Sequence, residues 1–139
     1  MRFMVIVKAS KESEAGKMPT EQELKDMGKF NDELVKAGVM LAGEGLLSSS
    51  KGARIQFNGT KRTVVDGPFT ETKELVAGFW LVQVKSREEA IELFKRCPFV
   101  EGELELRQVA EEADFGDMVN KVPEVFESER KLREQSARH

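Results

Sequence analysis

The stretch Phe3-Met4-Val5-Ile6-Val7 is an unbroken apolar run, rich in β-branched residues, near the start of the chain. A run of this length and composition is typical of a strand that is buried on both faces. A second such run, GFWLVQV, occupies residues 78–84. These two segments predict two strands, and the segments around them predict the other elements of the fold.

Each of these strands is followed by a predicted helix. Residues 20–23 and residues 86–89 both have the Ser/Thr-x-x-Glu spacing of a capping box, in which a hydroxyl and a carboxylate satisfy free amides at a helix start. Apolar residues then recur at helical spacing, so that each helix has one apolar face. On the first helix these residues are Leu24, Met27, Phe30 and Leu34, and on the second they are Ala90, Ile91, Phe94 and Cys97.

The remaining strands are short. Residues 39–47 predict one strand, and the alternation of residues 103–107 predicts a half-exposed last strand. Between them, residues 54–57 alternate in polarity before Asn58-Gly59, a strong hairpin-turn signal, and residues 63–65 predict the return strand. We therefore expect an α+β fold, a ferredoxin-like β-α-β-β-α-β sheet with an inserted β-hairpin.

Both helices of such a fold lie on one face of the sheet. The opposite face would leave apolar side chains in solvent, and a second copy of the chain is the simplest cover for it. The sequence therefore predicts a homodimer.

Composition excludes several classes of protein. The 139 residues carry 22 basic and 25 acidic side chains, a net charge of 22 − 25 = −3, which does not favour nucleic acid or an anionic membrane surface. One cysteine excludes a disulfide within the chain. No stretch approaches the roughly 20 apolar residues of a membrane span, and the start has no signal-peptide pattern. We expect a cytoplasmic protein.

The tail from Ala113 changes character: Gly116 and Pro123 interrupt it, its apolar residues are few, and charge is concentrated in residues 128–139. We expect two parts, a domain over residues 1–112 and a helical tail over residues 113–139. A short amphipathic helix starting at Pro123-Glu124 should pack on the body or on a dimer partner, and the end should be frayed.

Residues 66–74 read DGPFTETKE, and this motif resembles the signature of the DGPF-domain branch of the YCII-related family. Residues 40–46, MLAGEGL, are similar to that family's AGEGL segment, and residues 78–80, GFW, to the start of one of its strands. Cys97-Pro98 and Val109 extend the resemblance to about residue 110. The resemblance implies a dimeric α/β-barrel of the ferredoxin-like type, with two sheets facing each other and a cleft near the DGPF segment.

The resemblance also bears on activity. Some members of the family are suspected enzymes that use a His–Asp pair, and others are associated with sigma-factor regulation. The only histidine of this chain is His139, its last residue, and Cys97 stands where relatives often have an acidic residue. Histidine-based chemistry is therefore not expected here.

Two carboxylates are candidates for chemistry. Asp66 either caps the turn that Gly67 and Pro68 make, or lies at the mouth of a cleft as a general base or ligand anchor. Glu44 lies between two glycines in an apolar strand, and a carboxylate in such a place needs an ionic partner or a ligand.

Four further residues are candidates for ligand binding. Glu71 and Lys73 would share one side of an extended segment, where they could bind a polar or zwitterionic ligand or simply pair with each other in solvent. Phe69 could line a pocket, and Arg54 could bind a ligand. The ionic partner of Glu44 could be Arg54, Arg62 or Lys73. No metal site or cofactor is expected, and Cys97 is expected to be a buried structural thiol because a helix C-terminus disfavours a thiolate.

Three functions are compatible with these residues. The first is a dimeric small-molecule-binding or sensing protein, whose ligand-binding residues would be Glu44, Arg54, Phe69, Glu71 and Lys73. The second is an enzyme that uses Asp66, with Glu44, Glu71 and Lys73, for acid/base chemistry on a small polar substrate. The third is a regulatory interaction protein linked to sigma-factor control, with the tail as its partner-facing helix.

Overall fold

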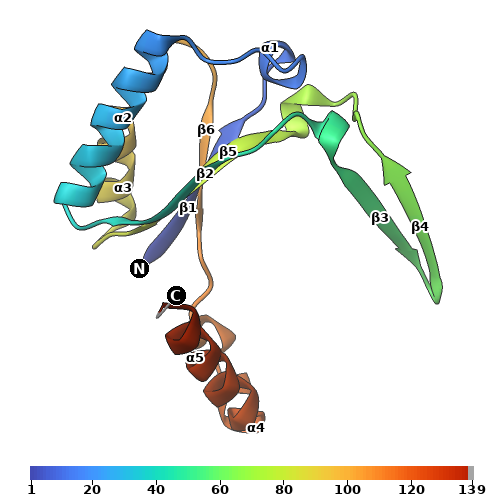
Figure 1. Ribbon diagram of the computed structural model, residues 1–139. Helices are drawn as coiled ribbons and strands as arrows, with labels where there is room; N and C mark the ends of the chain where they lie inside the picture. The colour runs from blue at the N-terminus through green and yellow to red at the C-terminus, as the bar shows by residue number, and fades with distance from the viewer. Residues whose placement is uncertain (138–139) are drawn as a thin grey trace. The chain divides into compact units, whose positions relative to one another are not determined.

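A four-stranded antiparallel sheet forms the framework of the chain in the computed structural model, which describes residues 1–137 (Figure 1). Strand β1 (Arg2–Lys8) pairs on one side with β5 (Val76–Gln83) and on the other with β6 (Leu104–Gln108), and β2 (Met40–Gly45) pairs with the far side of β5. The two apolar runs of the sequence therefore lie side by side at the centre. An α+β fold with an antiparallel sheet is confirmed.

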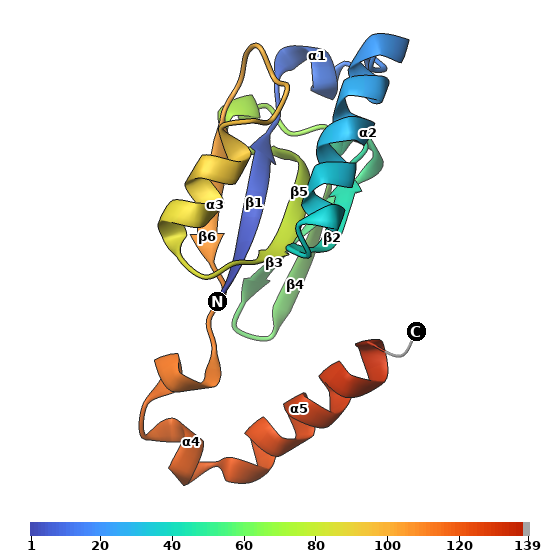
Figure 2. The same cartoon turned by 90° about the vertical axis from the view of Figure 1, so that its left-hand side faces the viewer.

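Two helices, α2 (Glu21–Lys36) and α3 (Arg87–Phe94), cover one face of this sheet (Figure 2). Both begin where the capping boxes predict. The Thr20 hydroxyl accepts a hydrogen bond from the Glu23 amide at 3.1 Å, and the Ser86 hydroxyl accepts one from the Glu89 amide at 3.1 Å. These caps satisfy amides that the first turn of a helix leaves free.

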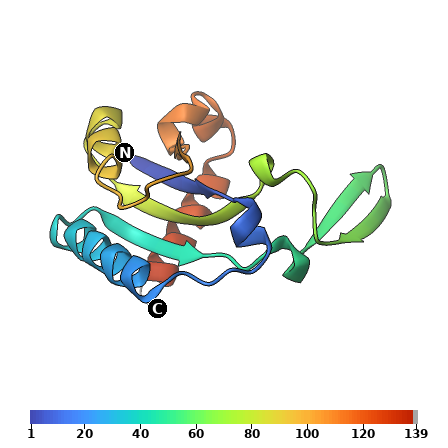
Figure 3. The same ribbon diagram turned by 90° about the horizontal axis from the view of Figure 1, so that it is seen from above.

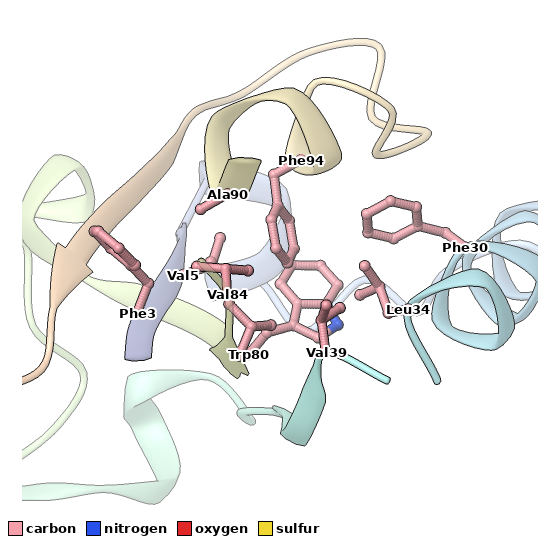
Figure 4. Close-up of a cluster of buried hydrophobic side chains, with 10 residues drawn as sticks. Phe3, Val5, Phe30, Leu34, Val39, Trp80, Val84, Ala90 and Phe94 are labelled. Atoms are coloured by element: carbon pink, nitrogen blue, oxygen red, sulfur yellow. The ribbon is translucent and has the colours of Figure 1, made fainter. Parts of the chain in front are cut away.

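The core lies between the helices and the sheet (Figure 4). Trp80 stands at its centre, with its ring edge-on to Phe30 at 6.0 Å and tilted against Phe94 at 5.3 Å between ring centroids. The indole Nε1 donates to Asn31 Oδ1 at 2.9 Å, so the polar atom of this buried side chain has a partner. The other buried members are Phe3, Val5, Leu34, Val39, Val82, Val84 and Ala90.

The opposite face of the sheet carries the alternate residues of the same strands. Met4 and Ile6 of β1 lie opposite Leu81 and Phe79 of β5, and all four side chains are partly exposed. The expectation that residues 3–7 are buried on both faces is therefore wrong for this single chain, because the helices cover only one face. Within residues 1–108, which the structure describes throughout, α2 and α3 both lie on the first face, and the four-residue helix α1 (Lys11–Glu14) lies near the end of the strands (Figure 1).

A β-hairpin forms a second, separate sheet of two strands, β3 (Ala53–Asn58) and β4 (Lys61–Asp66). It is the insertion expected between the second and third strands. Asn58 pairs with Lys61, so the turn is made by Gly59-Thr60, with Gly59 in the left-handed region at φ 61°. The return strand is longer than the predicted residues 63–65. Figure 3 shows the hairpin extending away from the main sheet and joined to it at its base.

The chain divides into two compact units, Met1–Gln108 and Val109–His139. The second unit contains a 3₁₀ turn, η3 (Glu112–Phe115), a short helix, α4 (Met118–Lys121), and a longer one, α5 (Pro123–Ala137). Helix α5 begins at the predicted proline but runs for 15 residues, so it is not short. The expected fraying of the end of the chain concerns residues 138–139, which lie outside those described.

The second unit is held together by a ring contact and an ion pair. The Phe126 side chain is buried, and its ring lies 5.5 Å from that of Phe115. The Arg130 guanidinium donates to both carboxylate oxygens of Glu112, with Nη2 3.0 Å from Oε2. Such a two-point contact fixes the angle between the groups as well as their distance.

The Glu112–Arg130 pair makes a pH-dependent contribution to the second unit. The hydrogen bonds from Arg130 hold the pKa of Glu112 below its ordinary value of 4.5. Because the folded pKa is the lower one, this contribution is present above pH 4.5 and is lost as the pH falls through the folded value. An NMR titration should place the Glu112 midpoint below 4.5, and Arg130→Gln should return it toward 4.5. An unchanged midpoint in that variant would contradict the assignment.

None of the helices formed by residues 1–137 combines the length and the apolar character needed to cross a membrane.

Candidate functional site

The DGPF motif closes the base of the hairpin. Asp66 ends β4, the Gly67-Pro68 peptide bond is cis, and the Gly67 amide donates to the Gly52 carbonyl at 3.0 Å. A Cβ atom added to Gly67 would lie 1.8 Å from the backbone oxygen of Ser49, so no side chain fits there without moving backbone. The glycine of the motif is therefore set by the close approach of two chain segments.

Ser49 connects this motif to the N-terminal part of the chain. Its hydroxyl accepts a hydrogen bond from the Phe69 amide at 3.0 Å and donates one to Glu14 Oε2. The Ser49 amide donates to Glu14 Oε1 at 3.0 Å, and the Ser48 hydroxyl donates to the Glu14 carbonyl at 2.7 Å. One glutamate and one serine thus join three segments of the chain that are distant in sequence.

Glu14 reaches this position because it ends a four-residue helix, α1 (Lys11–Glu14). The stretch from Lys8 to Pro19 is polar and contains Gly16 and Pro19, a composition that predicts a loop. Ser10 and Ser13 instead make a reciprocal capping box, in which each hydroxyl accepts from the other's amide, at 3.1 Å and 2.9 Å. Serine in place of the usual glutamate at the fourth position still satisfies both amides.

Arg54 of β3 lies over the ring of Phe69. The guanidinium carbon is 3.8 Å from the ring centroid, a distance at which a cation is attracted by the negative face of an aromatic ring. The contact fixes the orientation of both side chains at the hairpin base.

These groups lie along an open surface cavity of about 480 Å³. Arg54, Lys51 and Phe69 form part of its lining, together with Glu14, Ser48 and Ser49. A further part is apolar, and it consists of Leu46, Leu47, Leu75 and Val76. The volume falls within the range of small-molecule sites, which are mostly apolar with a few placed polar groups.

The structure brings two of the six predicted site residues into this cavity, Arg54 and Phe69. Asp66, Glu44, Glu71 and Lys73 are exposed, and none of them lines it. Asp66 pairs with Ala53 at the end of the hairpin, and Glu44 pairs with Phe79 on the open face of the main sheet.

Glu71 and Lys73 do not share one side of an extended segment, because the segment is not extended. Residues Thr72–Glu74 form a 3₁₀ turn, η2, and Glu71 precedes it. Three residues of such a turn complete a full rotation, so neighbours two apart point in different directions.

Glu14, Ser48 and Ser49 were not among the predicted residues. The Ser48-Ser49-Ser50-Lys51-Gly52 segment has the composition of a flexible turn. Near Glu14, the Ser10-x-x-Ser13 spacing is a local pattern that could have indicated the start of a helix. The contact between residues 14 and 49 depends on the tertiary fold, and no local pattern indicates it.

Cys97 lies outside this site, beside a smaller cavity of about 180 Å³ that follows α3. The thiol is partly buried and not fully buried as predicted. Its partial burial raises the pKa of the thiol, which disfavours the thiolate that a nucleophile requires. In residues 1–137, no three His, Cys, Asp or Glu side chains gather closely enough to hold a metal ion.

Comparison with known proteins defines the class. The family model of the YCII-related domain matches residues 1–113, and the chain belongs to that family. The uncharacterized protein R00369 of Rhizobium meliloti (strain 1021) is 31% identical over 72 residues, which are 52% of this chain and 58% of that protein. The matched segment thus spans little more than half of that relative's length.

A solved structure with a similar fold is the 5-chloro-2-hydroxyhydroquinone dehydrochlorinase TftG of Burkholderia phenoliruptrix AC1100, in complex with 2,5-dihydroxybenzoquinone. The match has a TM-score of 0.48 and 13% identity, and it covers 81% of this chain and 97% of the other.

Proposed function

We propose that this chain is a dimeric small-molecule-binding or sensing protein of the YCII-related family, and that its ligand is a small organic anion with an apolar part. The observation that supports this proposal is the cavity at the hairpin base, where Arg54 and Phe69 meet. The ligand would lie between the hairpin base and the segment that follows β2.

The charges of the cavity favour an anion. Arg54 and Lys51 bring two positive charges to its lining, while the carboxylate of Glu14 already accepts two hydrogen bonds from Ser49. Arginine presents a planar array of donors that suits a carboxylate. The leucines and Phe69 would contact the apolar part of the ligand.

The dimer proposal rests on the open face of the sheet. Met4, Ile6, Phe79 and Leu81 form a contiguous apolar surface on adjacent strands. Two such faces packed together would give the ferredoxin-like dimeric α/β-barrel and would remove these side chains from water.

Arg54→Gln should weaken binding of a carboxylate probe by roughly ten-fold or more, because it removes a charge-assisted hydrogen bond. Isothermal titration with benzoate and with hexanoate measures the effect. Benzyl alcohol, which has the ring but no charge, should bind more weakly than benzoate to the unmodified protein.

Lys61→Gln is the matched control. Lys61 belongs to the same hairpin but lies at its tip, paired with Asn58, and it does not line the cavity. This variant should bind the probes as the unmodified protein does. Equal losses in both variants, or no binding of any carboxylate to the unmodified protein, would overturn the proposal.

The enzyme hypothesis is less favoured, because Asp66 is exposed and lies outside the cavity lining. Regulation linked to sigma factors, with the tail as the interacting helix, stays a prediction, as does the cytoplasmic location.

A further inference from the structure

The hairpin presents an apolar surface that the chain itself leaves uncovered. Every residue of β3 and β4 is exposed. Ile55 pairs directly with Val64, and Phe57 pairs with Arg62, so these four side chains lie on one face of the ribbon. Ile55, Phe57 and Val64 are 58%, 70% and 64% exposed.

Such an arm is not expected to be stable in isolation. A two-stranded hairpin in water is marginal at best, and its strands require packing on one face. The contacts of Gly67, Phe69 and Ser49 hold only its base. Side chains beyond the base, such as Phe57, need another surface if they are to be buried.

The position of the arm favours a second copy of the chain as that surface. Helices α2 and α3 lie on one side of the main sheet, and the hairpin projects on the other side, where the open face lies (Figures 1 and 2). A copy seated on the open face would therefore lie beside the arm.

Charge supports the same occupant. Residues 51–66 contain Lys51, Arg54, Lys61 and Arg62 but one acid, Asp66, so the arm has a charge of 4 − 1 = +3. The whole chain has −3, and the remainder therefore has −3 − 3 = −6. A positive arm and a negative body are complementary between two copies of one chain.

We infer that the β3–β4 hairpin is an arm that packs its Ile55–Phe57–Val64 face on the second copy of the chain. This inference rests on the dimer that forms part of the proposed function. The arm would extend the interface beyond the two sheets, and each copy would bury the other's arm.

Phe57→Ser tests the inference, measured by sedimentation equilibrium over a range of protein concentrations. Loss of a buried aromatic side chain from the interface should weaken the dimer by roughly ten- to one-hundred-fold. Gln56→Ala is the matched control, because Gln56 is adjacent but faces the other side of the ribbon, and it should leave the dissociation constant within about two-fold.

Hydrogen exchange on the unmodified protein gives a second measurement, which does not depend on a variant. Amides of residues 53–65 should exchange more slowly at concentrations where the dimer dominates than where the monomer does. A dimer that Phe57→Ser leaves unchanged, with equal exchange at both concentrations, would overturn the arm inference and leave the sheet-to-sheet dimer standing. A chain that is a monomer at every concentration would overturn both.

Discussion

Gly67→Ala should destabilise the first unit by about 1–3 kcal/mol or more and should abolish binding at the cavity. The added Cβ would meet the backbone oxygen of Ser49 at 1.8 Å, and the next atoms in its path are also backbone. Backbone cannot move aside as a flexible side chain does, so the hairpin base has to separate from residues 49–50. Phe69 would move with it, and the cavity would lose one wall.

Urea unfolding followed by fluorescence measures the first part of this result, because Trp80 is the only tryptophan and belongs to the core of the first unit. Gly28→Ala is the matched control. Gly28 lies inside α2, and an added Cβ would meet no side chain and no other segment within 4 Å, so alanine there should stabilise by roughly 0.5–1 kcal/mol. Equal stability of Gly67→Ala and the unmodified protein would show that the hairpin base is not packed as described.

Phe94→Ala should cost about 3–5 kcal/mol of unfolding free energy, the range for truncation of a large buried aromatic side chain. Phe94 is 4% exposed, and its ring contacts those of Phe30 and Trp80 at 5.5 and 5.3 Å. Helix α3 has only eight residues, so the cavity left behind would remove much of what holds it on the sheet.

The same urea experiment measures this loss, and Lys95→Ala provides the comparison. Lys95 is the next residue, and its side chain is 67% exposed in a pair with Glu92, so this variant should stay within about 0.5 kcal/mol of the unmodified protein. A loss below about 1 kcal/mol for Phe94→Ala would mean that the aromatic cluster contributes little to stability.

The framework of the first unit could be predicted because its signals are local. The capping boxes place the starts of α2 and α3 correctly, and the apolar runs identify β1 and β5. Helix caps and hydrophobic periodicity depend on residues within one or two helical turns of each other, and tertiary packing stabilises the same elements that they favour. Strand β4 and helix α5 were predicted too short, because their ends are polar and polarity alone does not end an element.

The candidate site could be predicted only in part. Arg54 and Phe69 were expected as ligand-binding residues, and both line the cavity. Glu14 and Ser49 were missed because 35 residues separate them and each belongs to a segment of turn-like composition. Asp66 was predicted as a site residue because it is a charged residue in a specific motif, but it does not line the cavity. Its neighbour Gly67 makes the close contact with the backbone of Ser49.

The triple role of Ser49 has a consequence for how related sequences can diverge. Its hydroxyl donates to Glu14 and accepts from the Phe69 amide, while its backbone oxygen sets the space allowed at Gly67. A substitution at position 14 or 49 leaves the other side chain without its hydrogen-bond partner, so these two positions should change together across the lineage or not at all. Glycine at 67 should persist whichever residue stands at 49, because the atoms that exclude a side chain there are backbone.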